Sequence, residues 1–330
     1  MDIRTIRATD DAFSDWYDVG LAAWRVDFPN GPIWQERELR VIYEGTEHHG
    51  MKLWVASDGG RVVGAAGLGL PYRDNLTLGE PEIFVRPEDR RRGIGTALLR
   101  TIEDAAQAEG RSSLLTYIEG PTDSPATPGT LFAQHHGFTE RIVEIARVQR
   151  PPFDLDTISE AEATARPFAT GYELLTWRDR VPDEHVDEYA RLQARLSTDA
   201  PLGELDYEGE VWDEARVRTS ERREERMGRG TWTAAAVAPD KSLAGITVIS
   251  LSTDGGELGM QETTLVDPAH RGHRLGLLLK VANLRSLLRD RPDVQTVWTW
   301  NADSNDHMVG INETLGYQVE GWAAGWQRDV

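Results

Sequence analysis

Residues 85–99 read Val-Arg-Pro-Glu-Asp-Arg-Arg-Arg-Gly-Ile-Gly-Thr-Ala-Leu-Leu, and residues 266–280 read Val-Asp-Pro-Ala-His-Arg-Gly-His-Arg-Leu-Gly-Leu-Leu-Leu-Lys. The prolines of the two stretches lie 181 positions apart. A second pair of landmarks, 131–138 and 310–317, places its glycines, Gly137 and Gly316, 179 positions apart. Because two separate landmarks share nearly one offset, the sequence predicts that one fold is repeated within the chain.

The same order of elements is predicted around both copies. Each copy has an opening strand, polar helices, two strands joined by a polar turn, a third strand entering the glycine motif, an amphipathic helix, another strand, a short helix and a closing strand. In the first copy these segments are 3–8, 11–24, 52–56, 61–67, 95–108 and 113–118. In the second copy the corresponding segments are 172–177, 184–196, 231–237, 242–251, 276–288 and 296–301. This order predicts an α/β fold in which helices cover both faces of a mixed sheet.

The chain is long enough for two domains, since its 330 residues exceed the usual size of one. The joint is predicted near Arg150-Pro-Pro-Phe153, where two prolines interrupt a strand-like run. The predicted domains are therefore 1–150 and 151–330.

The turn in the first copy joins a strand to a helix. Such a turn directs free backbone N–H groups outward at the positive end of the helix dipole, and glycine lets phosphate oxygens approach closely. A pyrophosphate site is predicted there.

The arginine-glycine pattern resembles the Q/R-x-x-G-x-G/A motif of the acyl-CoA-dependent N-acyltransferase (GNAT) family, filled here by Arg90, Gly93 and Gly95. The order of elements and the later Gly137-Phe138 pair also fit that family. The resemblance implies two tandem GNAT domains, with acetyl-CoA as the acyl donor. In the first copy it places the cofactor on Val85, Arg90, Arg91, Arg92, Gly93, Ile94, Gly95 and Thr96.

The second copy departs from the motif because Arg274 stands where the first copy has Gly93. Gly272 supplies flexibility elsewhere in this loop, and His273 and Arg274 either add positive charge near phosphate or are ordinary surface residues. The cofactor residues implied here are Leu265, Val266, Arg271, Gly272, His273, Arg274, Leu275, Gly276 and Leu277. The backbone N–H groups around Leu265 and Val266 are expected to hold the thioester carbonyl.

The second half is predicted to be the catalytic one. After its post-motif strand come Asn301 and Asn305, and the resemblance implies that an asparagine here binds the pantetheine amide. Both are also explained as turn or cap residues, and for Asn305 a cap role can coexist with cofactor binding. The matching stretch of the first half, 119–128, has three prolines and no such asparagine.

Acylation of an amine requires a proton acceptor, for which Glu262 is the nearest carboxylate on the strand entering the motif. Glu82 is its counterpart in the first half, shifted by one residue, so the two glutamates are predicted to face opposite sides of their sheets. Many GNAT enzymes use a tyrosine, four residues before the glycine of the Gly-Phe pair, to protonate the thiolate. Here those positions are Ala133 and Asn312, and the proton is expected from water positioned by Asn312.

Composition excludes several classes of function. The chain has no cysteine, which rules out disulfides and a cysteine nucleophile, and its histidines show no spacing typical of a metal site. The net charge of −19 opposes nucleic-acid binding. With no apolar run long enough for a membrane span and no signal sequence, a cytoplasmic monomer or homodimer is expected.

The whole-chain arrangement is similar to that of tandem GNAT proteins of the mycothiol synthase type, in which one half acetylates a cysteinyl amine. The predicted function is acetyl-CoA-dependent acetylation of a small-molecule amine. Two alternatives stay open: a catalytically silent CoA-binding scaffold and a protein N-acetyltransferase. Two tryptophan pairs, Trp298 with Trp300 and Trp322 with Trp326, are expected to pack in the second domain's core and in a groove between the domains.

Overall fold

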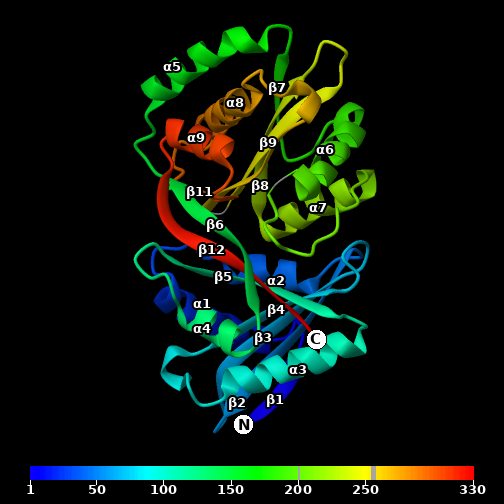
Figure 1. Cartoon of the computed structure of the whole chain (residues 1–330), viewed down its shortest axis with the longest axis vertical. Coiled ribbons are helices and arrows are strands. Elements are labelled where there is room, and N and C mark those ends of the chain that lie inside the picture. The colour runs from blue at the N-terminus through cyan, green and yellow to red at the C-terminus, as the bar shows by residue number, and fades with distance from the viewer. Residues whose placement is uncertain (200, 254–257) are drawn as a thin grey trace. The chain divides into compact units, whose positions relative to one another are not determined.

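The repeat folds twice, as two separate units of mixed α/β architecture (Figure 1). The computed structural model describes residues 1–199, 201–253 and 258–330. Unit 1 comprises Met1–Glu144, Leu202–Glu208 and Glu320–Val330, and unit 2 comprises Ile145–Pro201 and Gly209–Val319. The mixed α/β fold predicted from the sequence is confirmed. In the described part of the chain, no helix is both long and apolar enough to cross a membrane.

Unit 1 follows the predicted order of elements. They are β1 (Asp2–Ile6), α1 (Ala12–Asp27), α2 (Glu36–Glu44), β2 (His49–Asp58), β3 (Arg61–Pro71), β4 (Leu78–Val85), a 3₁₀ turn η1 (Pro87–Asp89), α3 (Ile94–Ala108), β5 (Ser113–Pro121), α4 (Pro128–His135) and the first part of β6 (Thr139–Gln149). Strands β1 to β4 pair antiparallel in chain order, and β4 then pairs with β5 in parallel.

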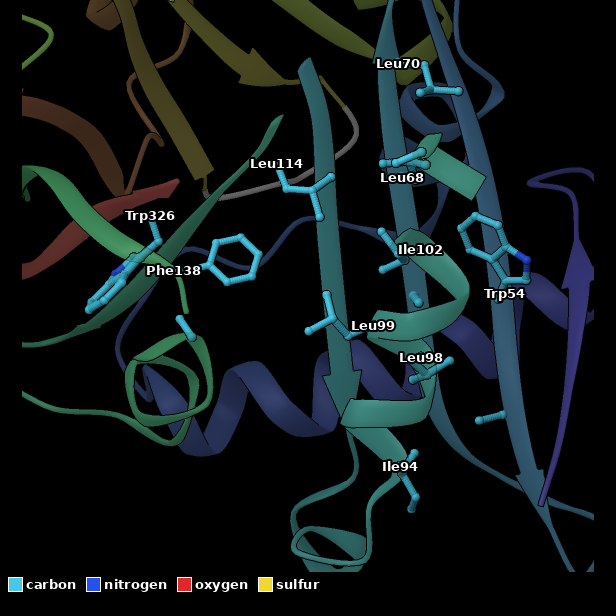
Figure 2. Packing of buried hydrophobic residues seen from close by; sticks show 14 of the residues in the cluster. Trp54, Leu68, Leu70, Ile94, Leu98, Leu99, Ile102, Leu114, Phe138 and Trp326 are labelled. Atoms are coloured by element: carbon cyan, nitrogen blue, oxygen red, sulfur yellow. The ribbon is translucent and has the colours of Figure 1, made fainter. Parts of the chain in front are cut away.

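The core of unit 1 lies between α3 and its sheet. Ile94, Leu98 and Ile102 are spaced so that one face of α3 is apolar, and they pack against β2, β3 and β5 through residues such as Trp54 and Leu114 (Figure 2). Helix α1 covers the other face, where the indole of Trp16 donates a hydrogen bond of 2.9 Å to the carbonyl of Ala66 on β3.

The last strand of the chain, β12 (Gln318–Asp329), completes unit 1. It pairs antiparallel with β5 from Gly321 opposite Pro121 to Asp329 opposite Ser113. Trp326 is 3% exposed and lies beside Phe138 in the unit 1 core (Figure 2). The expectation that Trp322 and Trp326 pack in the core of the second domain is therefore wrong, because the strand that carries them pairs with the first half of the sequence.

Replacing Trp326 with alanine should destabilise unit 1 by about 3–5 kcal/mol, since the change removes a large buried ring and leaves a cavity. Hydrogen exchange, measured separately for each peptide of a digest, should be faster in α3 and β5 of the variant than in the wild type. Trp298→Ala is the matched control, because Trp298 is equally buried but lies in unit 2. Faster exchange confined to unit 2 in Trp326→Ala would contradict the placement of β12.

Unit 2 repeats this order after an added helix. Its elements are α5 (Leu155–Ala165), η2 (Arg166–Ala169), β7 (Glu173–Arg178), η3 (Asp183–His185), α6 (Val186–Asp199), α7 (Glu214–Met227), β8 (Arg229–Val237), β9 (Leu243–Ser252), β10 (Leu258–Val266), η4 (Pro268–His270), α8 (Leu275–Asp290), β11 (Thr296–Ala302) and α9 (Asp306–Thr314). Helices α8 and α9 lie on one face of the sheet and α6 and α7 on the other (Figure 1). The end of β6, from Ile145 onward, also belongs to unit 2.

In both units the two parallel strands pair briefly and then separate. Strand β4 pairs with β5 only at Leu78 and Gly79, although it continues to Val85. Strand β10 pairs with β11 from Leu258 to Met260 and continues to Val266. Each unit therefore has a pair of diverging arms, which leave backbone groups without a partner on the neighbouring parallel strand.

Candidate functional site

The two glycine loops make the same turn with different residues. Each loop has two left-handed residues separated by one position: Arg91 (φ 65°) and Gly93 (φ 83°) in unit 1, and Gly272 (φ 87°) and Arg274 (φ 53°) in unit 2. Left-handed backbone is uncommon for arginine, so each loop carries one strained residue. The departure at Arg274 therefore preserves the turn, with Gly272 taking over the glycine's role at the other left-handed position.

Both loops end at a helix whose first turn lacks a side-chain cap. The N-cap residues, Gly93 for α3 and Arg274 for α8, make no capping hydrogen bond. A Cβ built on Gly93 or Gly272 would meet no atom within 4 Å, so open space adjoins the loop. Uncapped N–H groups, open space and the helix dipole together suit a pyrophosphate. The first-turn residues predicted from the sequence, Ile94 to Thr96 and Leu275 to Leu277, are at these helix ends.

The second glycine of each motif has a packing role. A Cβ on Gly95 would lie 3.1 Å from the ring of Phe132, and one on Gly276 would lie 3.2 Å from Ile311. Both neighbours belong to the next helix of the same unit. These glycines therefore allow two helices to approach closely, and replacing them would disturb packing together with any cofactor site.

The arginines of the first loop divide into two classes. Arg90 donates to both carboxylate oxygens of Asp27, at 2.8 and 2.7 Å, and Arg92 pairs with Asp58 and Asp89. These two guanidinium groups anchor the loop. Arg91 is exposed, and no described residue forms a hydrogen bond or ion pair with its side chain. It is the arginine best placed to bind phosphate.

The side chains of the second loop contact the added segment before β7. His273 Nδ1 lies 2.8 Å from the carbonyl oxygen of Phe168, and the guanidinium of Arg274 lies 4.3 Å from the centre of the Phe168 ring. Arg271 pairs with Asp199 at 3.1 Å. These contacts favour the surface interpretation of His273 and Arg274, so the backbone of the loop, rather than these side chains, is the part suited to a phosphate.

In each unit, the last valine of the strand that enters the glycine loop, Val85 or Val266, has its backbone N–H directed away from the neighbouring antiparallel strand. The N–H of Asp267 donates to Ala244 on β9, and that of Arg86 donates to Val63 on β3. Because backbone groups alternate along a strand, the N–H groups of Val266 and Val85 point away from those neighbours. Leu265 has the opposite orientation and is buried, so a role for its N–H at a thioester finds no support.

Glu262 lies two positions beyond Met260, the last residue of β10 that pairs with β11. Its side chain is exposed, and Ser250 donates a hydrogen bond of 2.8 Å to its Oε1. It lies on the face of the sheet covered by α6 and α7, where its negative charge is one of the causes, after burial, that raise the pKa of Tyr189. A carboxylate in this position is accessible to an amine.

Glu82 lies on the corresponding face of unit 1, so the prediction of opposite faces is wrong. Strand β10 has a β-bulge between Gln261 and Thr264, and the extra residue compensates for the one-residue shift between the repeats. Tyr43 of α2 donates a hydrogen bond to Glu82, and burial raises the pKa of the Glu82 carboxyl. Sequence reasoning did not assign Glu82 to the site, because a bulge cannot be recognised from residue spacing alone.

The three predicted asparagines have different environments. Asn305 is the N-cap of α9, where its Oδ1 accepts from the N–H of Met308 at 3.3 Å. Asn301 and Asn312 are 7% and 0% exposed. Asn312 Nδ2 donates to Asn301 Oδ1 at 3.0 Å. Asn312 is therefore committed to a buried network, and the geometry does not support its predicted role in positioning a water for the thiolate.

The same network contains a lysine that sequence reasoning missed. Lys280 is 2% exposed and donates to Asn312 Oδ1 at 2.6 Å, and Arg147 donates to Asn301 Oδ1 at 3.3 Å. Burial lowers the pKa of Lys280 to about 7. The repeat offers one signal: Leu99 takes the same position in the first copy and is buried in its core. A lysine at a core position of a repeat is unusual.

Lys280→Leu should stabilise unit 2 by roughly 2–4 kcal/mol below pH 7, because it removes a buried charge. The pKa of Lys280 is about 7 in the folded state against an ordinary 10.5, so the unfolded state binds more protons between these values. Wild-type stability therefore rises with pH across that window, and the advantage of the variant shrinks. Urea unfolding at several pH values tests this, and an advantage that does not vary with pH would contradict it.

Comparisons with known proteins agree with this geometry. The Acetyltransferase (GNAT) family matches residues 14–138. A mycothiol acetyltransferase from Parafrankia sp. (strain EAN1pec) is 28% identical over 313 residues, which cover 91% of this chain and 90% of that protein.

Two solved structures are similar over nearly the whole chain. A tandem GNAT protein from the clavulanic acid biosynthesis pathway has a TM-score of 0.79 and 27% identity, covering 99% of this chain and 98% of the other. A GCN5-related N-acetyltransferase from Sphaerobacter thermophilus has a TM-score of 0.67 at 16% identity, covering 99% and 95%. The second likeness concerns the fold alone.

Proposed function

The chain is a tandem GNAT protein and an N-acetyltransferase, and from this premise we propose that it transfers the acetyl group of acetyl-CoA to the primary amine of a small molecule in unit 2. The observation that carries the choice of unit is the exposed carboxylate of Glu262, two positions past the point where β10 stops pairing with β11. In unit 1 the equivalent carboxylate, Glu82, already accepts a hydrogen bond from the hydroxyl of Tyr43.

The residues of unit 2 fit acetyl-CoA at three places. The uncapped first turn of α8 and the open space at Gly272 suit the pyrophosphate. The N–H of Val266 points away from β9 and suits the thioester carbonyl, where a backbone donor stabilises developing negative charge. Asn305 is available near the start of α9 for a polar contact with the pantetheine arm.

A side chain of unit 2 can accept the proton that the amine must lose before it attacks. Glu262 accepts a proton from the ammonium form of the acceptor, directly or through water, which leaves a neutral amine able to attack. The amine nitrogen forms a bond to the carbonyl carbon, the carbon–sulfur bond breaks with its electron pair remaining on sulfur, and the second proton lost from nitrogen goes to water. Ser250 fixes the orientation of Glu262 through its hydrogen bond of 2.8 Å. The absence of cysteine from the chain favours this direct transfer over a covalent cysteine intermediate.

Two observations support a small-molecule acceptor. The similar proteins named above are a mycothiol acetyltransferase and a protein of the clavulanic acid pathway, and both names refer to small molecules. The net charge of −19 also favours a cationic acceptor over an anionic one.

A transfer assay tests the proposal. The protein is incubated with acetyl-CoA and a panel of small primary amines, with a lysine-containing peptide as the competing acceptor, and products are identified by mass spectrometry. Acetylation of one or more small amines is expected. Acetylation of the peptide only would instead identify a protein acetyltransferase, and no transfer to any acceptor would contradict the proposal.

Unit 1 is the second candidate for the site of transfer. It is the unit whose sequence matches the GNAT family, over residues 14–138. It also has Arg91 in its loop, whose side chain pairs with none of the residues that the structure describes, and a carboxyl group, Glu82, whose pKa is raised by burial. Variants that block one unit at a time separate these two possibilities.

A further inference from the structure

Two cations are buried in unit 2 without an anion. Lys280 on α8 is 2% exposed and Arg147 on β6 is 4% exposed. Their side chains donate to the amide oxygens of Asn312 and Asn301, and within the described part of the chain neither contacts a carboxylate. A buried charge without a counter-charge is strongly unfavourable, and the first copy of the repeat avoids it with Leu99. This arrangement requires an explanation.

The network reaches the diverging part of β11. Lys280 donates a hydrogen bond to Asn312, and Asn312 donates one of 3.0 Å to Asn301. Asn301 lies on β11, three positions beyond Trp298, which is the last residue of β11 that pairs with β10. The Asn301 oxygen accepts from both Asn312 and Arg147, and its Nδ2 donates to the carbonyl of Ala302 at 3.2 Å. The positive charge is thus rigidly tied to the arm of β11 that borders the opening in unit 2.

We propose that Lys280, held against the open arm of β11 through Asn312 and Asn301, is a positioning residue whose buried charge stabilises negative charge on the sulfur of the departing CoA. The inference rests on the proposed function, since it requires acetyl-CoA to occupy unit 2. It also supplies what the missing tyrosine leaves open, because both halves lack that acid at the expected position.

The step it assists is the breaking of the carbon–sulfur bond. The neutral nitrogen of the acceptor, whose ammonium proton Glu262 has already accepted, supplies the electron pair for the new carbon–nitrogen bond. The sulfur keeps the pair from the broken bond, and the further proton that nitrogen loses on forming the amide goes to water. The thiolate leaves as an anion and takes a proton from water afterwards. A nearby cation in a region of low dielectric lowers the energy of that anion without transferring a proton itself.

The surroundings of Lys280 contain few other charges. Arg147 lies at the far end of the same network, and the ring of Tyr317, whose pKa is raised by burial, lies 5.0 Å from Lys280 Nζ. The charged groups that meet α8 elsewhere are Glu162 of α5, which pairs with Arg285, and Asp290, which accepts from Trp232. None of these groups changes the pKa of Lys280, which burial alone lowers.

The test measures the pKa of the thiol of bound CoA by the ultraviolet absorbance of the thiolate. Since the chain has no cysteine, CoA supplies the only thiol in the sample. Binding is confined to unit 2 by working in a Gly93→Asp background, and CoA is titrated in the parent and in Lys280→Leu. We expect the pKa of the bound thiol, obtained from the thiolate absorbance at about pH 6–7 where Lys280 still carries its charge, to be about one unit higher in Lys280→Leu than in the parent.

Two further variants make the result specific. Arg285→Met removes a positive charge from the exposed side of the same helix and should leave the thiol pKa as in the parent. Asn312→Leu breaks the link between Lys280 and Asn301 and should raise it. Equal thiol pKa values in the parent and Lys280→Leu, with CoA still bound, would overturn the role of Lys280 and leave the proposed function intact. No CoA binding in the Gly93→Asp background would overturn the assignment to unit 2 and this inference together.

Discussion

Glu262→Gln is expected to lower kcat for acetyl transfer by about 10²- to 10³-fold, because glutamine keeps the shape of the side chain but cannot accept the proton. The KM for acetyl-CoA should change little, since Glu262 lies on β10 and is not part of the loop or helix that suit the cofactor. Steady-state rates measured across a range of pH provide the check, and the loss should be smallest at high pH, where more of the acceptor amine is already neutral.

Glu82→Gln is the matched control for this prediction. It makes the same chemical change on the corresponding face of unit 1, where the carboxyl already accepts a hydrogen bond from Tyr43. The rate should stay within about threefold of the wild type, a change of less than 1 kcal/mol. A large loss in Glu82→Gln together with an active Glu262→Gln would transfer the proposed catalytic role to unit 1.

The second large effect concerns the phosphate loop of unit 2. Gly272→Asp should weaken acetyl-CoA binding to unit 2 by about 10- to 100-fold, whereas Gly272→Asn should weaken it only slightly. Both side chains tolerate left-handed backbone better than most residues, and a Cβ at this position meets no atom within 4 Å. The two variants therefore differ mainly by one negative charge beside the pyrophosphate, and calorimetric titration measures the difference.

The same pair of changes at Gly93 reports on unit 1. If both units bind acetyl-CoA, wild type should show two sites, and each aspartate variant should lose one. Equal affinities for Gly272→Asp and Gly272→Asn would show that no phosphate lies near this loop. Gly93 and Gly272 are preferable to Gly95 and Gly276 for this purpose, because the latter two pack against Phe132 and Ile311.

The sequence was informative wherever local spacing determines structure. The repeat follows from two short motifs that each recur about 180 positions later, and the strand and helix that flank each glycine loop follow from patterns within each copy. The turn itself was not predicted, because the sequence marks Arg274 only as a departure from the motif; the structure shows that Gly272 and Arg274 preserve in unit 2 the two left-handed positions that Arg91 and Gly93 provide in unit 1. The role of Glu262 as proton acceptor stays a prediction.

The sequence was uninformative where distant segments determine structure. Pairing of β12 with β5 joins residues about 200 positions apart, and no local pattern marks Trp326 as part of the unit 1 core. The bulge in β10 changed the face assigned to Glu262 relative to Glu82. The burial of Asn312 depends on its contact with Lys280, a residue on another helix. The division into domains at residue 150 stays a prediction about the repeat, because the compact units exchange short segments across it.

The most direct test of the central claim is the rate of acetyl transfer in the two variants that each block one loop. With a saturating amine found in the acceptor panel, Gly93→Asp should retain most of the wild-type rate, and Gly272→Asp should lose it at acetyl-CoA concentrations near the wild-type KM. The opposite pattern, with activity retained in Gly272→Asp and lost in Gly93→Asp, would contradict the assignment of transfer to unit 2.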